Sequence, residues 1–254
     1  MRRAGRRLLR RLRRRLPPRL RRRLGGRRRA VRRGAGAADP WLRPEAVDVL
    51  DCSCGIGTQA IGLAHRGYRV HGTDLSPRAV ERARVEAARL GAKVSFGVAD
   101  FRTLDAVAGE FDVVLSHDNA VPHLLDDADV LTALRSMRSK LRAEGLLLVS
   151  TRDYDEALAT RPATMPPRLV EGPPRRLVAR FHDWDGPESP LHTVWFFVLR
   201  ETDAGWTLEQ HSVRYRAITR AALASLADEA GLRDVGWIEP DATGLTQPLL
   251  VASR

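Results

Sequence analysis

The chain has 254 residues, of which 43% are hydrophobic and 29% charged. This composition supports a packed core and argues against global disorder. No apolar run reaches the roughly 18 residues that a membrane-spanning helix needs, which excludes a helical membrane protein. The cysteines, Cys52 and Cys54, lie too close in sequence for a disulfide framework or a four-ligand zinc site. We therefore expect no metal site and a reducing, cytoplasmic compartment.

The formal net charge of +12 comes from one segment. Residues 1–38 hold 18 of the 43 Lys and Arg and no Asp or Glu, whereas the rest of the chain carries 25 basic against 31 acidic residues. Repulsion among the arginines favours disorder in this segment. It could act as a nucleic-acid arm, an anchor on anionic lipid or a transit-like peptide. The interpretation that we favour is a solvated tail or a start codon assigned too far upstream. The lack of an apolar core segment argues against a secretory signal.

From residue 46 onward, short apolar runs alternate with amphipathic segments. The apolar runs predict strands at 46–50, 68–73, 94–98, 111–116 and 146–150. Ser76 and Pro77 are a good N-cap and first residue for the second helix. A later helix is marked by Val130, Leu134, Met137 and Leu141. This alternation predicts a doubly wound α/β sheet.

The rhythm changes after the fifth strand. Residues 176–184, 191–201 and 206–215 read as three consecutive strands separated by turn signals. A final helix, capped by Thr219, and two strands near 232–238 and 248–252 follow. We therefore predict one domain over residues 39–254. It contains a doubly wound, seven-stranded sheet with an antiparallel β insertion at 155–216, before the last helix.

A glycine-containing loop, VLDCSCGIGT, joins the first strand to the first helix. Gly55 and Gly57 allow close backbone approach, and the helix N-terminus offers N–H groups to an anionic part of a ligand. Asp74 ends the next strand, where a carboxylate can accept hydrogen bonds from ribose hydroxyls. Asp100 ends the third strand, placed to accept from an adenine amino group, with Phe101 beside the ring. Carboxyl ends of adjacent parallel strands are where ligands bind in such sheets.

The loop also satisfies the dinucleotide pattern G-x-G-x-x-A, so a nicotinamide-dependent enzyme competes with other interpretations. Asp51 precedes the loop, where its charge suits a cationic or zwitterionic ligand better than a pyrophosphate. Asp100 adds a second acidic strand end. No tyrosine lies four residues before Lys93 or Lys140, so the Tyr-x-x-x-Lys pair of short-chain dehydrogenases is absent from the sequence.

Together, VLDCSCGIGT, GTDLS, VADF, FDVVLSHDN and LRAEGLLLV resemble the motifs of class I S-adenosylmethionine-dependent methyltransferases, in order and spacing. The resemblance implies a Rossmann-like fold and S-adenosyl-L-methionine as cofactor. One departure is Ser53, where many members have glycine. The cysteines of the loop read as small packing residues.

Candidate acceptor residues follow the fourth and fifth strands, in HDNAVPH and STRDYD. Arg152 can bind a carboxylate through two hydrogen bonds, and Asn119 could assist it. A salt bridge to a neighbouring Asp is the alternative for Arg152. His123 reads more readily as a packing residue.

These stretches resemble the glycine/sarcosine N-methyltransferase group. The resemblance implies that Asn119 and Arg152 hold an amino-acid carboxylate and that Tyr215 is an active-site tyrosine. It also places Ser53, Asp74, Asp100, Phe101 and His117 on cofactor positions. That group folds an aromatic-rich N-terminal segment over its active site. Here, Trp41 is the only aromatic residue of the given sequence before the first predicted strand.

Three functions follow. The first is N-methylation of glycine or a related small amine. The second is a nucleic-acid methyltransferase with the arginine segment as phosphate-binding arm, against which stand the acidic balance of the rest and the lack of an Asn/Asp-Pro-Pro-aromatic motif. The third is a non-catalytic cofactor-binding domain that has lost its lid.

Overall fold

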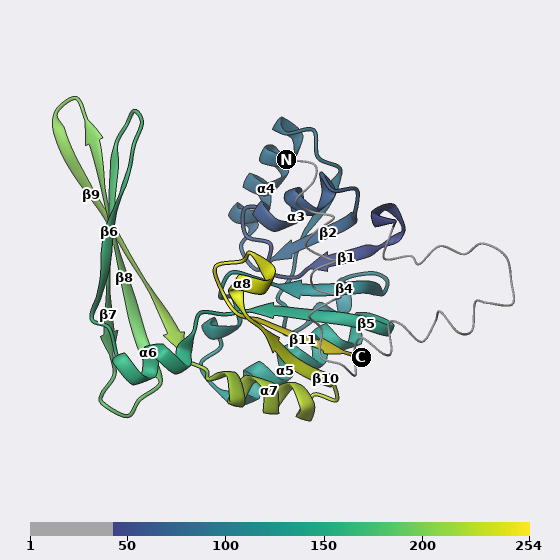
Figure 1. The fold of residues 1–254 in the computed structure, drawn as a ribbon. Helices are drawn as coiled ribbons and strands as arrows, with labels where there is room; N and C mark the ends of the chain where they lie inside the picture. Colours follow the sequence, from purple (N-terminus) through teal and green to yellow (C-terminus); the bar gives the residue numbers. More distant parts are fainter. Residues whose placement is uncertain (1–42) are drawn as a thin grey trace, which may run out of the picture. The chain divides into compact units, whose positions relative to one another are not determined.

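A computed structural model describes residues 43–254. The predictions for residues 1–38, and the domain boundary at 39, lie outside the described residues. The chain divides into two units (Figure 1). In its described part, unit 1 contains residues up to Val121, Asp127–Arg152 and Ala221–Arg254, and unit 2 contains Pro122–Asp126 and Asp153–Arg220.

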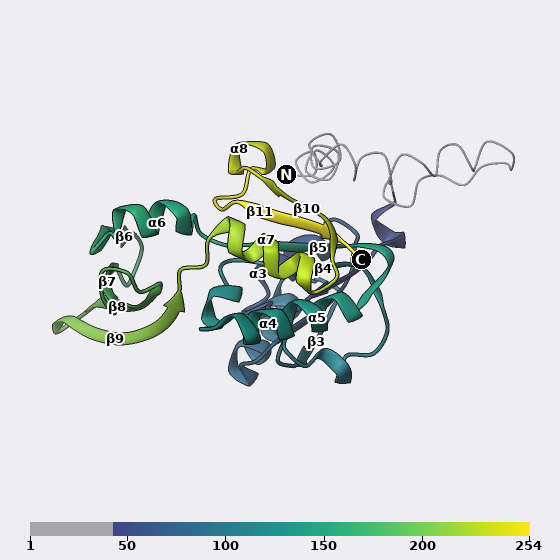
Figure 2. The same ribbon diagram turned by 90° about the horizontal axis from the view of Figure 1, so that it is seen from below.

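Unit 1 is built on a seven-stranded sheet, which confirms the predicted fold class. The strand order is β10-β11-β5-β4-β1-β2-β3, and β11 runs antiparallel to both of its neighbours, whereas the other pairs are parallel (Figures 1 and 2). Its strands are β1 (Asp48–Asp51), β2 (Arg69–Asp74), β3 (Val94–Val98), β4 (Phe111–Ser116), β5 (Leu141–Ser150), β10 (Arg233–Ile238) and β11 (Leu249–Ser253). The order reverses direction between β1 and β4, which is where ligands bind in open α/β sheets.

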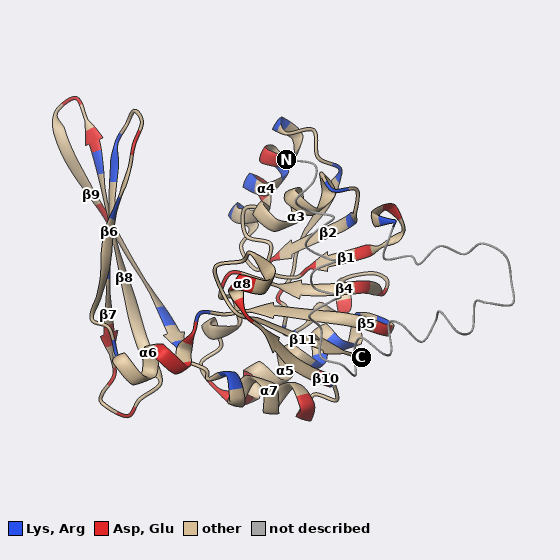
Figure 3. Ribbon diagram, in the orientation of Figure 1, with Lys and Arg blue, Asp and Glu red and all other residues tan. Residues whose placement is uncertain are grey.

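The connecting helices are α3 (Thr58–Ala64), α4 (Pro77–Arg89), α5 (Asp127–Ser139), α7 (Arg220–Glu229) and α8 (Pro240–Thr243). Right-handed crossovers place α3 and α4 on one face of the sheet and α5 on the other. Ser76 is the N-cap of α4, as predicted, because its hydroxyl accepts from the backbone N–H of Ala79. Helix α4 carries charges of both signs (Figure 3), and Arg84 pairs there with Glu81 and Arg89 with Glu86.

The prediction that Leu141 belongs to a helix is wrong. Helix α5 ends at Ser139, and β5 begins at Leu141, which pairs with Phe111 of β4 and is fully buried. Glu144 then adopts a left-handed φ of 64°, and the register between β4 and β5 shifts. The helical spacing of Leu141 was misleading because a buried leucine fits either element when the chain turns immediately before it.

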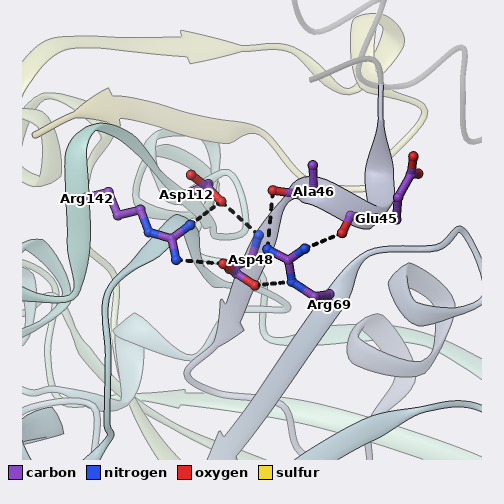
Figure 4. Close-up of polar contacts among 6 residues, drawn as sticks. All are labelled: Glu45, Ala46, Asp48, Arg69, Asp112 and Arg142. Atoms are coloured by element: carbon purple, nitrogen blue, oxygen red, sulfur yellow. Dashed lines mark hydrogen bonds and ion pairs between the residues drawn. The ribbon is translucent and has the colours of Figure 1, made fainter. Parts of the chain in front are cut away.

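Four charged residues tie together the strand starts, at the edge opposite the strand ends that carry the motifs (Figure 4). Arg142 bridges Asp48 and Asp112 at 2.6 and 2.7 Å, and Arg69 pairs with Asp48 at 2.6 Å. Because these contacts join β1, β2, β4 and β5, they order the start of the sheet. The pKa of Asp48 is lowered, chiefly by its hydrogen bond from Arg69.

Unit 2 contains an antiparallel sheet in the order β6-β7-β8-β9, together with helix α6 (Tyr154–Thr160). Its strands are β6 (Thr164–Val170), β7 (Arg176–Trp184), β8 (Leu191–Thr202) and β9 (Gly205–Arg216). The sequence predicted three of these strands and missed β6. That strand contains Pro166 and Pro167, which discourage a strand prediction, and it tolerates them because it lies at the sheet edge, where its register shifts.

Candidate functional site

The loop between β1 and α3 is held by its neighbours on both sides. The backbone N–H of Cys52 donates to the carbonyl of Leu115 on β4, and that of Cys54 donates to the carbonyl of Thr73 on β2, each across 2.9 Å. The loop therefore continues the sheet pairing of β1 before it turns into the helix. This places it over the carboxyl ends of three adjacent parallel strands.

The two glycines of the loop have different roles. A Cβ on Gly57 would lie 3.1 Å from both Ala83 and Ile61, so this glycine serves close packing between the loop and α4. A Cβ on Gly55 would meet nothing within 4 Å in the described residues. Both have positive φ, 52° for Gly55 and 89° for Gly57. Gly55 is thus where the loop backbone faces open space.

Asp74 connects the loop to the end of β2. Its Oδ2 accepts from the N–H of Gly55 at 2.8 Å, and its Oδ1 accepts from the N–H of Ser76 at 2.9 Å. Both bonds come from backbone groups, so the carboxylate is oriented by the loop and by the start of α4. An ionised carboxylate has about four acceptor positions, which leaves capacity for further donors.

Asp51 is the most unusual residue of this region. Its side chain is buried, and neither carboxylate oxygen has a hydrogen-bond partner among the described residues. Burial raises its pKa to about 7, and the charge of Asp74 adds to the rise, whereas the backbone amides of Ser53 and Ala60 act in the opposite direction. An unpaired buried carboxylate at a strand end fits a ligand that brings a positive charge or N–H donors.

Asp100 lies two residues past the end of β3, next to Asp74. The backbone N–H of Ala99 donates to the carbonyl oxygen of Asp74 across 3.1 Å, which fixes this proximity. The Asp100 carboxylate is bound by Arg102, and these hydrogen bonds lower its pKa. Phe101, which lies between Asp100 and Arg102 in the sequence, is partly buried. Two acidic strand ends therefore adjoin each other, as the sequence suggested.

Ser53 and His117 lie at the β1 and β4 ends of the same edge. The hydroxyl of Ser53 shares a hydrogen bond of 3.0 Å with that of Ser116, which brings the loop next to the residue before His117. Burial lowers the pKa of His117 to about 4, against a smaller opposing effect of Asp118. Its imidazole is therefore neutral at pH 7.

The loop after β4 has a strained backbone. Asp118 and Asn119 both adopt left-handed φ values, 58° and 70°. Ser150 at the end of β5 holds them, because its hydroxyl accepts from the N–H of Asp118 and its carbonyl accepts from the N–H of Asn119. The side-chain oxygen of Asn119 in turn accepts from the N–H of Arg152. Such strain persists where surrounding contacts determine it and is common at functional sites.

The guanidinium of Arg152 makes no ion pair or hydrogen bond with any described residue. The alternative of a salt bridge to a neighbouring Asp therefore finds no support within residues 43–254. Its neighbour Asp153 pairs instead with Arg220, at 2.5 Å. A partly buried arginine that has no anionic partner in residues 43–254 is suited to bind a carboxylate from a ligand.

The structure brings Asn119 and Arg152 together in unit 1, whereas Tyr215 belongs to unit 2. There Tyr215 is buried on β9, with ring centroids 4.6 Å from His123 and 5.9 Å from His192. His123 thus packs against an aromatic ring, in agreement with its reading as a packing residue.

Sequence reasoning missed three residues that organise this edge: Arg102, Ser150 and Gln247. Gln247 contacts both Ser150 and Asp118 through its amide. Ser150 stands in the STRDYD stretch but was given no role there, whereas Arg102 and Gln247 belong to no motif. The partners of all three are set by tertiary structure, so the sequence carries no signal for their roles. Burial raises the pKa of both Cys52 and Cys54, as expected for packing residues. Among the described residues, no cluster of His, Cys, Asp or Glu could hold a metal, and no helix is long and apolar enough to cross a membrane.

Comparison with known proteins agrees with the fold and the motifs described above. Residues 49–145 match the family described as a methyltransferase domain. The chain is 33% identical over 114 residues to a glycine/sarcosine N-methyltransferase of Parasynechococcus marenigrum, covering 44% of this chain and 40% of that protein. It is 32% identical over 126 residues to human glycine N-methyltransferase, covering 44% and 43%. The chain thus spans about two fifths of the curated relatives that it matches.

Solved structures extend the likeness in fold. CalS10, an amino pentose methyltransferase from Micromonospora echinaspora, is 24% identical with a TM-score of 0.69, covering 91% of this chain and 88% of that one. The sugar N-methyltransferase KedS8 from Streptoalloteichus is 18% identical with a TM-score of 0.68, covering 91% and 86%. Fold and motifs therefore confirm the resemblance to class I methyltransferases.

Proposed function

We propose that this chain, whose residues 49–145 match the methyltransferase-domain family, uses S-adenosyl-L-methionine to methylate the nitrogen of a small amine that carries a carboxylate, such as glycine. The cofactor assignment rests on the arrangement of Asp51, Gly55 and Asp74. A buried carboxylate and a glycine, neither with a close neighbour on its ligand side among the described residues, meet an oriented strand-end carboxylate at one edge of the sheet. These groups fit a ligand with a cationic amino-acid part and a ribose.

In this assignment, Gly55 makes room for the amino-acid part of the cofactor and Asp51 balances its ammonium charge. Asp74 accepts from the ribose hydroxyls, and Asp100 and Phe101 hold the adenine. Ser53, Gly57 and His117 shape the surrounding loops. S-Adenosylmethionine supplies a methyl group on a sulfonium, which is already activated toward attack by a neutral amine.

The acceptor assignment rests on Arg152. Its guanidinium lacks a protein partner among the described residues, and Asn119 holds its backbone. A ligand carboxylate would supply the guanidinium with a partner. Binding in this way would orient the amine nitrogen of a small amino acid for methyl transfer. Positioning alone can supply roughly 7–11 kcal/mol of barrier reduction. The curated relatives named as glycine and sarcosine N-methyltransferases support this choice. Tyr215 remains a proposed acceptor residue on the basis of its motif alone.

The test has two parts. Calorimetry with S-adenosylhomocysteine should give micromolar binding that Asp74→Ala abolishes, and absence of binding by the wild type would refute the proposal. Methyl transfer should then occur to glycine or sarcosine but not to ethanolamine, which lacks the carboxylate. Binding without turnover across a panel of amines would instead favour a non-catalytic domain. Salt-sensitive RNA binding that survives removal of residues 1–38 would favour a nucleic-acid methyltransferase.

A further inference from the structure

Arg102 binds the Asp100 carboxylate through three N–H groups. Its backbone N–H donates to Oδ1 at 2.8 Å, and its Nη2 donates to Oδ2 at 2.7 Å. Its Nε–H is shared between the two oxygens, at 3.2 Å from Oδ1 and 3.0 Å from Oδ2. Of the roughly four acceptor positions on a carboxylate, about one remains. The direction of that remaining lone pair is set by the planar guanidinium.

The arginine is itself held from the other side. Its Nη1 donates to Asp129 in the first turn of α5 at 2.9 Å. The side chain of Asp100 is 22% exposed, against 38% for Arg102 and 42% for Asp129. Of these three hydrogen-bonded side chains, Asp100, the one beside Asp74, is thus the least exposed. Arg102 orients Asp100, and Asp129 holds Arg102.

We propose that Arg102 is a positioning residue that directs Asp100 to accept from the 6-amino group of the cofactor's purine, so that the site selects a 6-amino over a 6-oxo ring. This inference rests on the proposed function. An ionised carboxylate only accepts hydrogen bonds, so it pairs with an amino group and repels a carbonyl oxygen. A carboxylate held in one orientation needs no reorganisation on binding, which favours the matching ligand.

The experiment compares two ligands, S-adenosylhomocysteine and S-inosylhomocysteine, which differ at the purine 6-position. Calorimetry should show that the wild type prefers the adenosyl ligand by roughly tenfold or more, as expected for a hydrogen bond to a charged group. In Arg102→Met, this preference should fall below about threefold through loss of adenosyl affinity. A merely structural role would weaken both ligands by the same factor.

Arg89→Met is the matched control. Arg89 forms a similar two-nitrogen contact with Glu86, at 2.9 and 2.6 Å, on the exposed surface of α4. Its removal should leave the ligand preference at the wild-type value. If Arg102→Met fails to fold, two milder variants can be measured in its place. Arg102→Lys keeps the charge but not the planar geometry, and Asp129→Asn weakens the outer anchor, so both should give intermediate preferences.

The outcomes separate this inference from the function on which it rests. If the wild type binds neither ligand, the proposed function fails. If the wild type binds both ligands equally, or if the Arg102 variants keep the full preference, the positioning role is refuted and the cofactor assignment stands. A preference that falls in the order wild type, Arg102→Lys, Arg102→Met supports the inference.

Discussion

The side-chain oxygen of Asn119 accepts a hydrogen bond from the backbone N–H of Arg152 across 3.1 Å. This contact joins the loops that follow β4 and β5, 33 residues apart in the chain. Asn119 is buried and left-handed, a conformation that asparagine tolerates better than most residues. A small amide thereby orders the backbone of the arginine to which we assign the acceptor carboxylate.

Two substitutions of Asn119 should separate the stability lost with its hydrogen bond from the stability lost by forcing another residue into a positive φ. Asn119→Gly loses the bond and should lower the free energy of unfolding by about 1–2 kcal/mol, because a partly buried N–H is left unpaired. Asn119→Ala should cost roughly 0.5–1 kcal/mol more, because alanine disfavours positive φ. Urea unfolding measures both variants. Equal stability of the two would contradict the backbone argument.

Arg152→Met should affect binding but not folding. The guanidinium has no partner among the described residues, so the free energy of unfolding should change by less than about 0.5 kcal/mol. The KM for a carboxylate-bearing amine should rise at least tenfold, which corresponds to about 1.4 kcal/mol for a charged hydrogen bond. Cofactor affinity should stay unchanged. A large loss of stability in this variant would show that Arg152 has a structural role instead.

The loop glycines should respond differently to alanine. Gly57→Ala should destabilise the protein by about 2–5 kcal/mol, because its Cβ would press on Ala83, Ile61 and Phe96 and because its φ is positive as well. Gly55→Ala should cost only about 1–2 kcal/mol, from its positive φ, but should weaken cofactor binding more strongly because its Cβ enters the open side. Thermal unfolding and calorimetry distinguish the two. Similar cofactor affinities in both variants would argue against the role assigned to Gly55.

The raised pKa of Asp51 makes stability depend on pH. Its pKa is about 7 in the folded protein, above the ordinary value of 3.8, so the folded state holds a proton that the unfolded state releases between these values. Stability contributed by this group is therefore lost as the pH rises toward 7. Asp51→Asn should be more stable than the wild type at pH 8, by at least about 1 kcal/mol. The difference should vanish near pH 4.

The same group should couple cofactor binding to pH. A cation bound beside Asp51 favours the ionised carboxylate, so binding should release a proton and strengthen between pH 6 and 8. Calorimetry in buffers of different ionisation enthalpy measures this proton release. Asp51→Asn serves as the control, since it has no proton to release. An identical proton release in this variant would assign the effect to another group.

The local pattern of the chain was sufficient for the fold class and for most of unit 1. Glycine in the turn, alternating apolar runs and the Ser76 cap depend on neighbouring residues only, so each can be predicted from the sequence alone. Where local signals were ambiguous, they misled: Leu141 belongs to a strand, and the proline-containing β6 was missed. Long-range pairing decided both cases, because a buried leucine or an edge proline takes its role from the partner strand.

Sequence alone determined which residue types stand at the strand ends, since the carboxylate that follows each of the first three apolar runs is visible without a fold. Only the tertiary structure decided how those side chains are bound: Asp74 by Gly55, Asp100 by Arg102, Asn119 by Arg152, and Asp51 by no described residue. The physical reason is that hydrogen-bond partners and burial arise when distant segments pack, and these two quantities set the orientation and charge of each group.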